Sequence, residues 1–199
     1  MARRARLVVP ETAHHVVARG VNHCRIYRHG FDKRRYLKRF AELASECEVE
    51  VHGYCLMDNH IHFLVTPKKP DSLARLFQKL HTWWAGYYNR KTRRTGHLFE
   101  SRFYSAPLDE AHFWAAIRYI DLNPKRAGLA GKNLKQQYSS LQAHLENKPD
   151  PLVTLNMEAI KRRHWSGKHW QEFLEEADWE RGKRLRQPES YPMPQLWIQ

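Results

Sequence analysis

The chain has 199 residues, 42% of them hydrophobic and 12% aromatic, which fits one folded domain or one domain with an extension. Lys and Arg outnumber Asp and Glu by 34 to 21, and the resulting net charge of +13 attracts polyanions such as nucleic acids. The three cysteines form no Cys-x-x-Cys pair and no apolar run approaches the ~20 residues of a membrane span, which argues against disulfide-rich, zinc-knuckle and membrane proteins and favours a cytoplasmic one. Association with the nucleoid would follow from binding to DNA.

The first strand and the first helix are expected in the N-terminal quarter of the chain. Residues 14–19 (HHVVAR) alternate loosely and include β-branched side chains, which is typical of a strand. Asp32 is a favourable N-cap, and apolar residues recur at helical spacing through the segment 33–48 that follows it. The sequence therefore predicts a strand and then an amphipathic helix.

A β-hairpin is expected next. Two apolar runs occupy residues 49–57 and 60–67, and the pair Asp58-Asn59 separates them. Because Asp and Asn favour tight turns, the two runs are predicted to be antiparallel neighbours.

Two further helices are predicted in the middle of the chain. Ser72 is expected to cap the first, which extends to about Arg93 before a Thr-Gly pair breaks it. The second starts near Glu110 and is expected to stop at Asn123, because Pro124 disfavours helical geometry in the residue before it.

The order of these elements predicts an α+β sandwich with one antiparallel sheet covered by helices. The stretch between the two helices, residues 97–108, is expected to be irregular or a short strand. After Gly131 the sequence becomes polar and then charged and rich in Trp. We therefore divide the chain into a domain over residues 1–131 and a C-terminal helical extension with an extended tail over residues 132–199.

The motif His60-Ile61-His62 lies on the second strand of the hairpin. Side chains of a strand alternate between its faces, so the two imidazoles project together while Ile61 points to the core. An arbitrary His-x-His pair more often consists of exposed histidines that bind no metal than of two metal ligands. The strongly apolar surroundings and a matching third group favour the metal site here.

The third group lies on the last predicted helix. Tyr119 and Asn123 are four residues apart and share one helical face. The amide oxygen of Asn123 is a hard ligand suited to Mg²⁺ or Mn²⁺, and Tyr119 would then point at the group that the metal polarises. Tyr138, which has Gln142 four residues on, is the alternative nucleophile.

Five segments occur in this order over roughly residues 5–145: ARGVNHCRIY, YCLMDNHIHFLVTP, NRKTRRTGHLFESRFYS, RYIDLNPKRAGL and YSSLQAH. The second contains a pattern that resembles the HUH signature (His, bulky hydrophobic, His), and the fourth resembles the tyrosine helix of the single-tyrosine HUH transposases. As a set they resemble the REP-associated tyrosine transposases.

This resemblance implies a ferredoxin-like α+β sandwich whose antiparallel sheet carries the HUH motif and has helices on one face. It implies that His60, His62 and Asn123 bind a divalent metal, Mg²⁺ or Mn²⁺, and that Tyr119 forms a 5′-phosphotyrosine. Asn123 stands where related transposases carry Gln, which also supplies an amide oxygen. The expected substrate is single-stranded or hairpin DNA of the repetitive extragenic palindrome type, cut and rejoined by a monomer or homodimer.

DNA binding requires a charged track with stacking surfaces. The sequence places cationic and aromatic side chains together around the end of the second predicted helix, and further cations near the N-terminus and the tyrosine helix. The expected DNA-binding residues are Arg3, Arg4, Arg6, Arg19, Arg90, Lys91, Arg93, Arg94, Phe99, Arg102, Phe103, Tyr104, Lys125 and Arg126.

Three other functions compete with this hypothesis. A host-retained nucleic-acid-binding protein without chemistry is the main alternative, and the intact set of His, Tyr and Asn residues argues against it. A two-histidine phosphoesterase requires two His-x-Ser/Thr motifs, and His60-Ile61-His62 is not one of them. A rolling-circle replication initiator usually carries a helicase domain, for which 199 residues are too few, or a second tyrosine.

Overall fold

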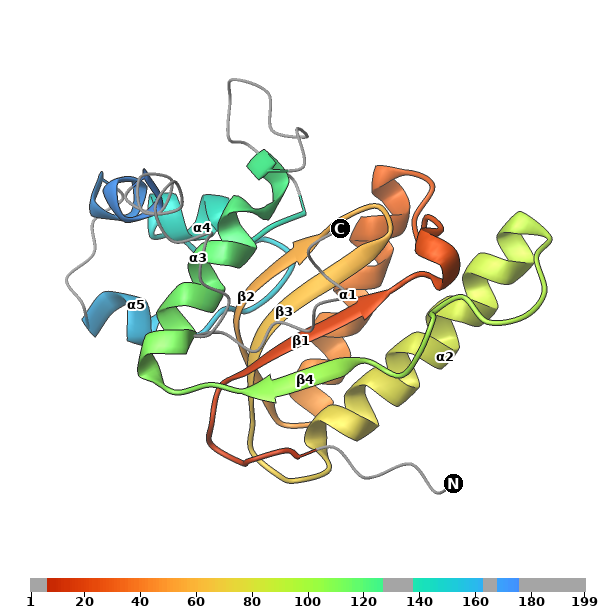
Figure 1. The fold of residues 1–199 in the computed structure, drawn as a ribbon, viewed down its shortest axis with the longest axis horizontal. Coiled ribbons are helices and arrows are strands. Elements are labelled where there is room, and N and C mark those ends of the chain that lie inside the picture. The colour runs from red at the N-terminus through yellow and green to blue at the C-terminus, as the bar shows by residue number, and fades with distance from the viewer. Residues whose placement is uncertain (1–6, 127–137, 163–167, 176–199) are drawn as a thin grey trace, which may run out of the picture.

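The computed structural model describes residues 7–126, 138–162 and 168–175 (Figure 1). Residues 168–175 are helical. The other elements, in chain order, are β1 (His14–Arg19), the short 3₁₀ helix η1 (Val21–His23), α1 (Gly30–Glu46), β2 (Val49–Leu56), β3 (His60–Pro67), α2 (Ser72–Thr92), β4 (Tyr104–Pro107), α3 (Glu110–Arg126), α4 (Leu141–Glu146) and α5 (Glu158–Arg162).

The four strands form one antiparallel sheet in the order β2-β3-β1-β4. With α1 between β1 and β2, and α2 between β3 and β4, this is a ferredoxin-like arrangement, which confirms the predicted α+β fold class. The two central strands pair so that Arg19, the last residue of β1, lies opposite His60, the first residue of β3. The end of β1 and the beginning of the HUH motif are therefore neighbours.

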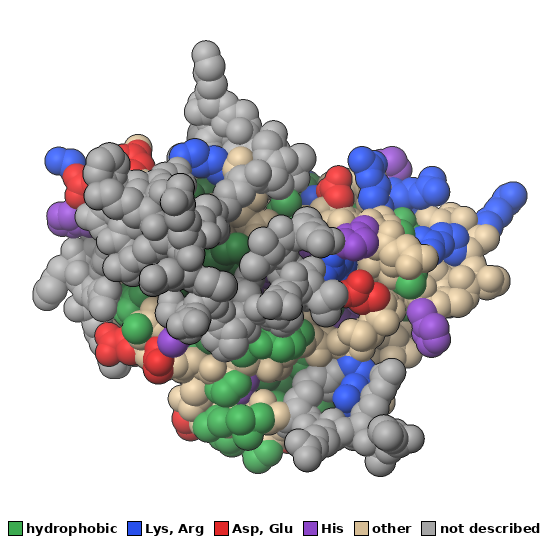
Figure 2. All heavy atoms as spheres, in the orientation of Figure 1, with side chains coloured by type: hydrophobic (Ala, Val, Ile, Leu, Met, Phe, Trp, Pro, Cys, Tyr) green, Lys and Arg blue, Asp and Glu red, His purple; other side chains and the backbone are tan. Residues whose placement is uncertain are grey.

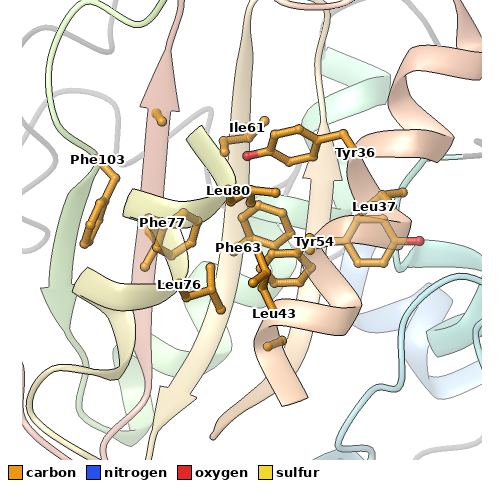
Figure 3. Close-up of a cluster of buried hydrophobic side chains, with 14 of the residues drawn as sticks. Tyr36, Leu37, Leu43, Tyr54, Ile61, Phe63, Leu76, Phe77, Leu80 and Phe103 are labelled. Carbon is orange, nitrogen blue, oxygen red and sulfur yellow. The ribbon is translucent and has the colours of Figure 1, made fainter. Parts of the chain in front are cut away.

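Helices α1 and α2 cover one face of the sheet. Alternate strand residues such as Ile61 and Phe63 point into this layer, where Phe63 stacks on Phe40 of α1 with ring centroids 3.9 Å apart. Phe77 and Leu80 of α2 fill the space beside them (Figure 3). This layer consists of aliphatic and aromatic side chains, and its burial supplies much of the hydrophobic stabilisation.

The opposite face of the sheet is covered by α3. A second hydrophobic cluster joins Leu64 of β3 and Cys55 of β2 to Ile117 and Ile120 of α3. The prediction of helices on one face only was therefore wrong, although it holds for α1 and α2. The strands signalled this, because β2 and β3 read as nearly continuous apolar runs, which is typical of strands covered on both sides.

The predicted elements were correct in kind, but three helix ends differ. Asp32 is the third residue of α1 instead of its cap, and its carboxylate accepts hydrogen bonds from the backbone N–H groups of Arg28 and His29. Ser72 is the first residue of α2, after the N-cap Asp71. Helix α3 continues past Pro124 to Arg126, although proline has no N–H to donate to the carbonyl oxygen four residues earlier.

The segment after residue 137 returns to the edge of the sheet. Backbone hydrogen bonds join Tyr138 to Leu56 and Ser140 to Tyr54, so this segment covers the outer edge of β2. Ile160, with the helical segment 168–175, packs with α3 in the second cluster. The boundary expected at residue 131 lies outside the described residues. No helix in the described ranges combines the length and apolarity needed to span a bilayer.

Candidate functional site

The two histidines of the HUH motif lie on the face of β3 that α3 covers. Their ring centroids are 5.0 Å apart, whereas Ile61 between them points to the α1–α2 layer. The alternation expected from the sequence is confirmed. His62 is wholly buried and His60 is partly buried at the start of the strand.

A third histidine, which is not among the ligands expected from the sequence, lies beside them. His15 of β1 is buried, and its ring stacks on that of His62 with centroids 5.2 Å apart. The Nε2 atom of His15 lies 3.0 Å from Nδ1 of His62, which is hydrogen-bonding distance. The sequence does show that His15 and Arg19 share one face of a strand. This places His15 near His62 only when the pairing of β1 with β3 is known.

Tyr119 of α3 approaches this group from the helix layer. Its ring centroid lies 5.3 Å from that of His62 and 6.1 Å from that of His15, with edge-to-face geometry in both pairs. The alternative tyrosine, Tyr138, lies elsewhere, with its hydroxyl against Gly30 and the Lys33 ammonium 5.7 Å from its ring centroid. Of the two candidates, Tyr119 is the one whose ring contacts the histidines.

Asn123 lies one helical turn after Tyr119 on the same helix. Its side chain is buried and forms a hydrogen bond with His60, so the helix supplies an amide group directly beside the HUH motif. The Nδ1 atom of His60 lies 2.7 Å from the side-chain oxygen of Asn59. An oxygen acceptor at that distance requires a proton on Nδ1, so the electron pair of the neutral imidazole lies on Nε2, the ring nitrogen that is left to face Asn123.

The electrostatics of the site keep all three histidines neutral. Burial lowers the pKa of His15 to about 4 and the pKa of His60 to about 4, and it lowers the pKa of His62 well below its usual value. For His60, the positive charges of Arg19 and Lys33 lower the pKa further, and the bond with Asn123 opposes them. Neutral imidazoles are the form that binds metal ions.

His60, His62 and Asn123 have the donor chemistry of a divalent metal site. Two neutral imidazoles and one amide oxygen suit Mg²⁺ or Mn²⁺ and leave coordination positions open for water and phosphate. Among the described residues, no three side chains drawn from His, Cys, Asp and Glu form a metal-binding group. The set therefore depends on the amide of Asn123 as its third member.

Arg19 and the segment after α2 lie at the same end of the sheet as His60. Backbone bonds join Arg19 to Glu100 and Val21 to Leu98, and the buried Arg19 side chain lies 3.4 Å from the Glu100 carboxylate. Figure 2 shows Lys and Arg side chains gathered where the start of α1 and the end of α2 meet. A polyanion bound there would lie next to the HUH motif.

The predicted DNA-binding residues around α2 differ in exposure. Arg90, Arg93 and Arg102 are exposed, as is Lys91, although its ammonium pairs with the buried Asp32 at 2.5 Å. Arg94 and Tyr104 are partly buried.

Two predicted stacking residues pack inside the protein. Phe99 is partly buried and stacks on His81 of α2, with ring centroids 4.1 Å apart. Phe103 is buried against Phe77 in the α1–α2 layer.

The remaining predicted contacts lie at the ends of the described segments. Lys125 is exposed on the last turn of α3. Arg126 is the final residue of that helix, and its side chain lies outside the described part. Arg3, Arg4 and Arg6 also lie outside the described residues.

Comparison with known proteins points to one family. The family model described as "Transposase IS200 like" matches residues 8–123, which include β1, the HUH motif, Tyr119 and Asn123. No curated protein matches the chain.

Two solved structures are similar. A REP-associated tyrosine transposase bound to a REP hairpin superposes with a TM-score of 0.57 at 12% identity, over 73% of this chain and 86% of that one. A candidate transposase from Deinococcus radiodurans R1 gives a TM-score of 0.40 at 17% identity, over 60% and 96% of the two chains. The first of these likenesses supports the fold.

Proposed function

Because the chain belongs to the IS200-like transposase family, we propose that it is a metal-dependent endonuclease and strand transferase that nicks and rejoins single-stranded DNA. Tyr119 is the nucleophile, and His60, His62 and Asn123 bind the metal. One observation carries the proposal: α3 brings the Tyr119 ring to 5.3 Å from the ring of His62, on the sheet face that holds the HUH motif. This is the mutual arrangement that a nucleophile and an adjoining metal site require.

The side chains of the site prepare the DNA phosphate for attack. A bound divalent metal would withdraw charge from a non-bridging phosphate oxygen and favour the ionised form of the tyrosine hydroxyl. His60 presents Nε2 because its Nδ1 faces Asn59, and burial keeps His62 in the neutral, ligating form. Asn123 supplies its amide from the helix that also carries Tyr119. Ligand and nucleophile are therefore held by one rigid element.

The chemical step exchanges one phosphoester bond for another. The Oη atom of Tyr119 bonds to phosphorus as the P–O3′ bond breaks, the hydroxyl proton leaves, and the departing oxygen takes up a proton to become a 3′-OH. The product is a 5′-phosphotyrosine ester that conserves the free energy of the phosphoester bond. A second 3′-OH can therefore reverse the step without ATP. A tyrosine with an ordinary pKa near 10 must give up its proton at a cost of about 4 kcal/mol at pH 7, which the metal and basic surroundings offset.

The proposed substrate is hairpin DNA of the repetitive extragenic palindrome type. The REP-associated transposase of similar fold is bound to such a hairpin, and the net charge of +13 in this chain favours a polyanionic partner. Exposed cations at the end of α2, including Arg90 and Arg93, lie at the end of the sheet where β1 meets His60. They are suited to hold the phosphates of the strand that enters the site.

The proposal is tested by trapping the covalent intermediate. A labelled single-stranded hairpin oligonucleotide, incubated with the full chain and Mn²⁺, should yield a protein–DNA adduct that survives denaturation. The adduct should disappear in Tyr119→Phe and in the presence of a chelator. Tyr138→Phe is the matched control, because it removes the same hydroxyl from the rival tyrosine, and it should retain the adduct.

Two results would overturn the assignment. Loss of the adduct in Tyr138→Phe with retention in Tyr119→Phe would move the nucleophile to Tyr138. Tight hairpin binding by the wild-type chain with no adduct under any metal would favour the non-catalytic nucleic-acid-binding function.

A further inference from the structure

A carboxylate with no part in the proposed chemistry lies at the centre of the tyrosine helix. Asp121 of α3 is completely buried, and three side chains donate hydrogen bonds to it. They are the hydroxyl of Ser140 at 3.1 Å, Nδ1 of His144 at 2.7 Å and the indole N–H of Trp170 at 3.0 Å. A buried carboxylate satisfied by three partners is a specific contact that holds its neighbours in one geometry.

His144 connects this carboxylate to the sheet. Its other ring nitrogen, Nε2, lies 2.9 Å from the carbonyl oxygen of His52 on β2 and must carry a proton to bond there. The imidazole therefore bridges helix α3 and strand β2 with both of its nitrogen atoms.

Ser140 makes a second connection to the same strand. Its hydroxyl oxygen accepts a hydrogen bond from the backbone N–H of Tyr54 at 3.0 Å while its proton faces Asp121. Gly53 leaves room for this approach, because a Cβ at that position would lie 3.2 Å from the Ser140 hydroxyl, a tight contact, and 3.4 Å from the His144 ring. The strand thus lacks a side chain where the two donors reach past it.

The position of Asp121 within the helix gives these contacts a consequence for the site. Tyr119 and Asn123 are each two residues from Asp121, so they project from a different side of the helix. Asp121 faces α4 and the segment 168–175, whereas Tyr119 and Asn123 face the histidines of the sheet. The rotation of α3 about its axis therefore decides whether Asp121 can reach its donors while Tyr119 and Asn123 reach the histidines.

We propose that Asp121 is a positioning residue that, through Ser140, His144 and Trp170, fixes the rotation and depth of α3 so that Tyr119 and Asn123 meet the HUH histidines. The proposal rests on the proposed function, and it gives a role to the segment YSSLQAH, which contains both Ser140 and His144. Through Asp121, it also links the described residues after 137 to the geometry of the nicking site.

The test separates positioning from stability with a matched pair of tryptophans. Trp170→Phe removes one buried N–H donor to Asp121, and Trp84→Phe removes one buried N–H donor to the Ile26 carbonyl, 2.9 Å away in the α1–α2 layer. Adduct formation, hairpin affinity and amide hydrogen exchange of residues 110–123 are measured for the full chain well below its unfolding temperature. Asp121→Ala removes the acceptor of all three donors, and Asp121→Asn keeps one acceptor oxygen.

The positioning role predicts a graded effect confined to α3. Asp121→Ala should slow adduct formation by roughly 10- to 100-fold, as expected for a small misplacement of a reacting group, with hairpin affinity within about twofold. Asp121→Asn should recover part of that rate, and Trp170→Phe should slow it less than Asp121→Ala does. Exchange of the α3 amides should accelerate in each of these variants, and Trp84→Phe should change neither the adduct rate nor that exchange.

Two outcomes overturn the proposal, and a third concerns the function alone. If Trp170→Phe and Trp84→Phe change the adduct rate and the α3 exchange equally, the Asp121 network only stabilises the fold. Unchanged amide exchange of α3 in Trp170→Phe would lead to the same conclusion. If Asp121→Ala does not fold, Trp170→Phe makes the same comparison with one bond to Asp121 removed, and Ser140→Ala makes it with the bonds to Asp121 and to Tyr54 removed. If the wild-type chain forms no adduct, the proposed function fails, and the exchange measurement still decides whether Asp121 holds the helix.

Discussion

The two faces of the sheet are built from the same strands but carry different chemistry. The cluster under α1 and α2 is aliphatic and aromatic, with Phe63 stacked on Phe40. The face under α3 holds the histidines on β1 and β3, the Asp121 network beside them at the β2 edge, and a smaller apolar cluster around Leu64. Adjacent residues of β3 therefore serve separate purposes, because His62 and Phe63 point in opposite directions.

This division explains how a small α+β protein can hold several buried polar groups. Burying neutral imidazoles and a carboxylate costs free energy unless each is hydrogen-bonded, and hydrophobic burial on the other face offsets that cost. This division between the two faces predicts that substitutions on the α1–α2 face change stability, and that substitutions on the α3 face change metal binding and chemistry.

The largest expected effect is on the apolar face. Phe63→Ala should lower the free energy of unfolding by about 3–5 kcal/mol, because it removes a wholly buried ring and leaves a cavity against Phe40. Urea denaturation followed by circular dichroism measures the loss. Phe31→Ala is the matched control, since that ring is 62% exposed and its removal should change the unfolding free energy by less than about 0.5 kcal/mol. Similar losses in both variants would contradict the assigned core.

A pH dependence of stability is the next largest effect and belongs to the polar face. The pKa of His15 falls from its ordinary 6.5 to about 4 in the folded chain because of burial, so the unfolded chain binds more protons between these values. The stabilisation is complete above pH 6.5 and is lost as the pH falls towards 4, by roughly 3 kcal/mol for this residue.

The measurement compares the unfolding free energies of the wild-type chain and His15→Leu from pH 7 to pH 4 in a chelating buffer. Carboxylates titrate in both proteins, so the difference between the two curves isolates the histidine. The wild-type curve should fall more steeply, and parallel curves would show that His15 is not buried in its neutral form.

The smallest of the three effects concerns metal affinity. If His62 binds the metal through Nε2, its Nδ1–H donates to Nε2 of His15 across 3.0 Å and fixes the orientation of the ring. His15→Leu should therefore weaken Mn²⁺ binding by roughly 10- to 100-fold in calorimetric titration. His15→Gln, whose amide oxygen can accept the same bond, should bind Mn²⁺ more tightly than His15→Leu. Unaltered affinity in both variants would remove His15 from the site.

The strands and their faces could be predicted from the sequence because alternation is a local property. The spacing of Tyr119 and Asn123 on one helix is equally local, and the structure places both beside the HUH motif. His15 was not expected at the site, because its proximity to His62 depends on the register between β1 and β3, which no local pattern encodes.

Other features depended on tertiary packing. Phe103 was expected to contact DNA because cations surround it in sequence, yet its ring enters the core against Phe77. Asp121 resembled an ordinary polar residue between the two proposed site residues. Its partners Ser140 and Trp170 lie far along the chain and meet it only after the segment beyond residue 137 has folded back on α3.

Strand β3 also limits how the gene for this protein can change. Point substitutions alter one residue of one face, and each can be tolerated or selected separately. Loss or gain of a single codon between residues 60 and 65 would exchange the two sets of side chains, placing imidazoles in the aromatic layer and Phe63 beside Tyr119. Length variation in related sequences should therefore be confined to the connecting loops, while the spacing within this strand stays fixed.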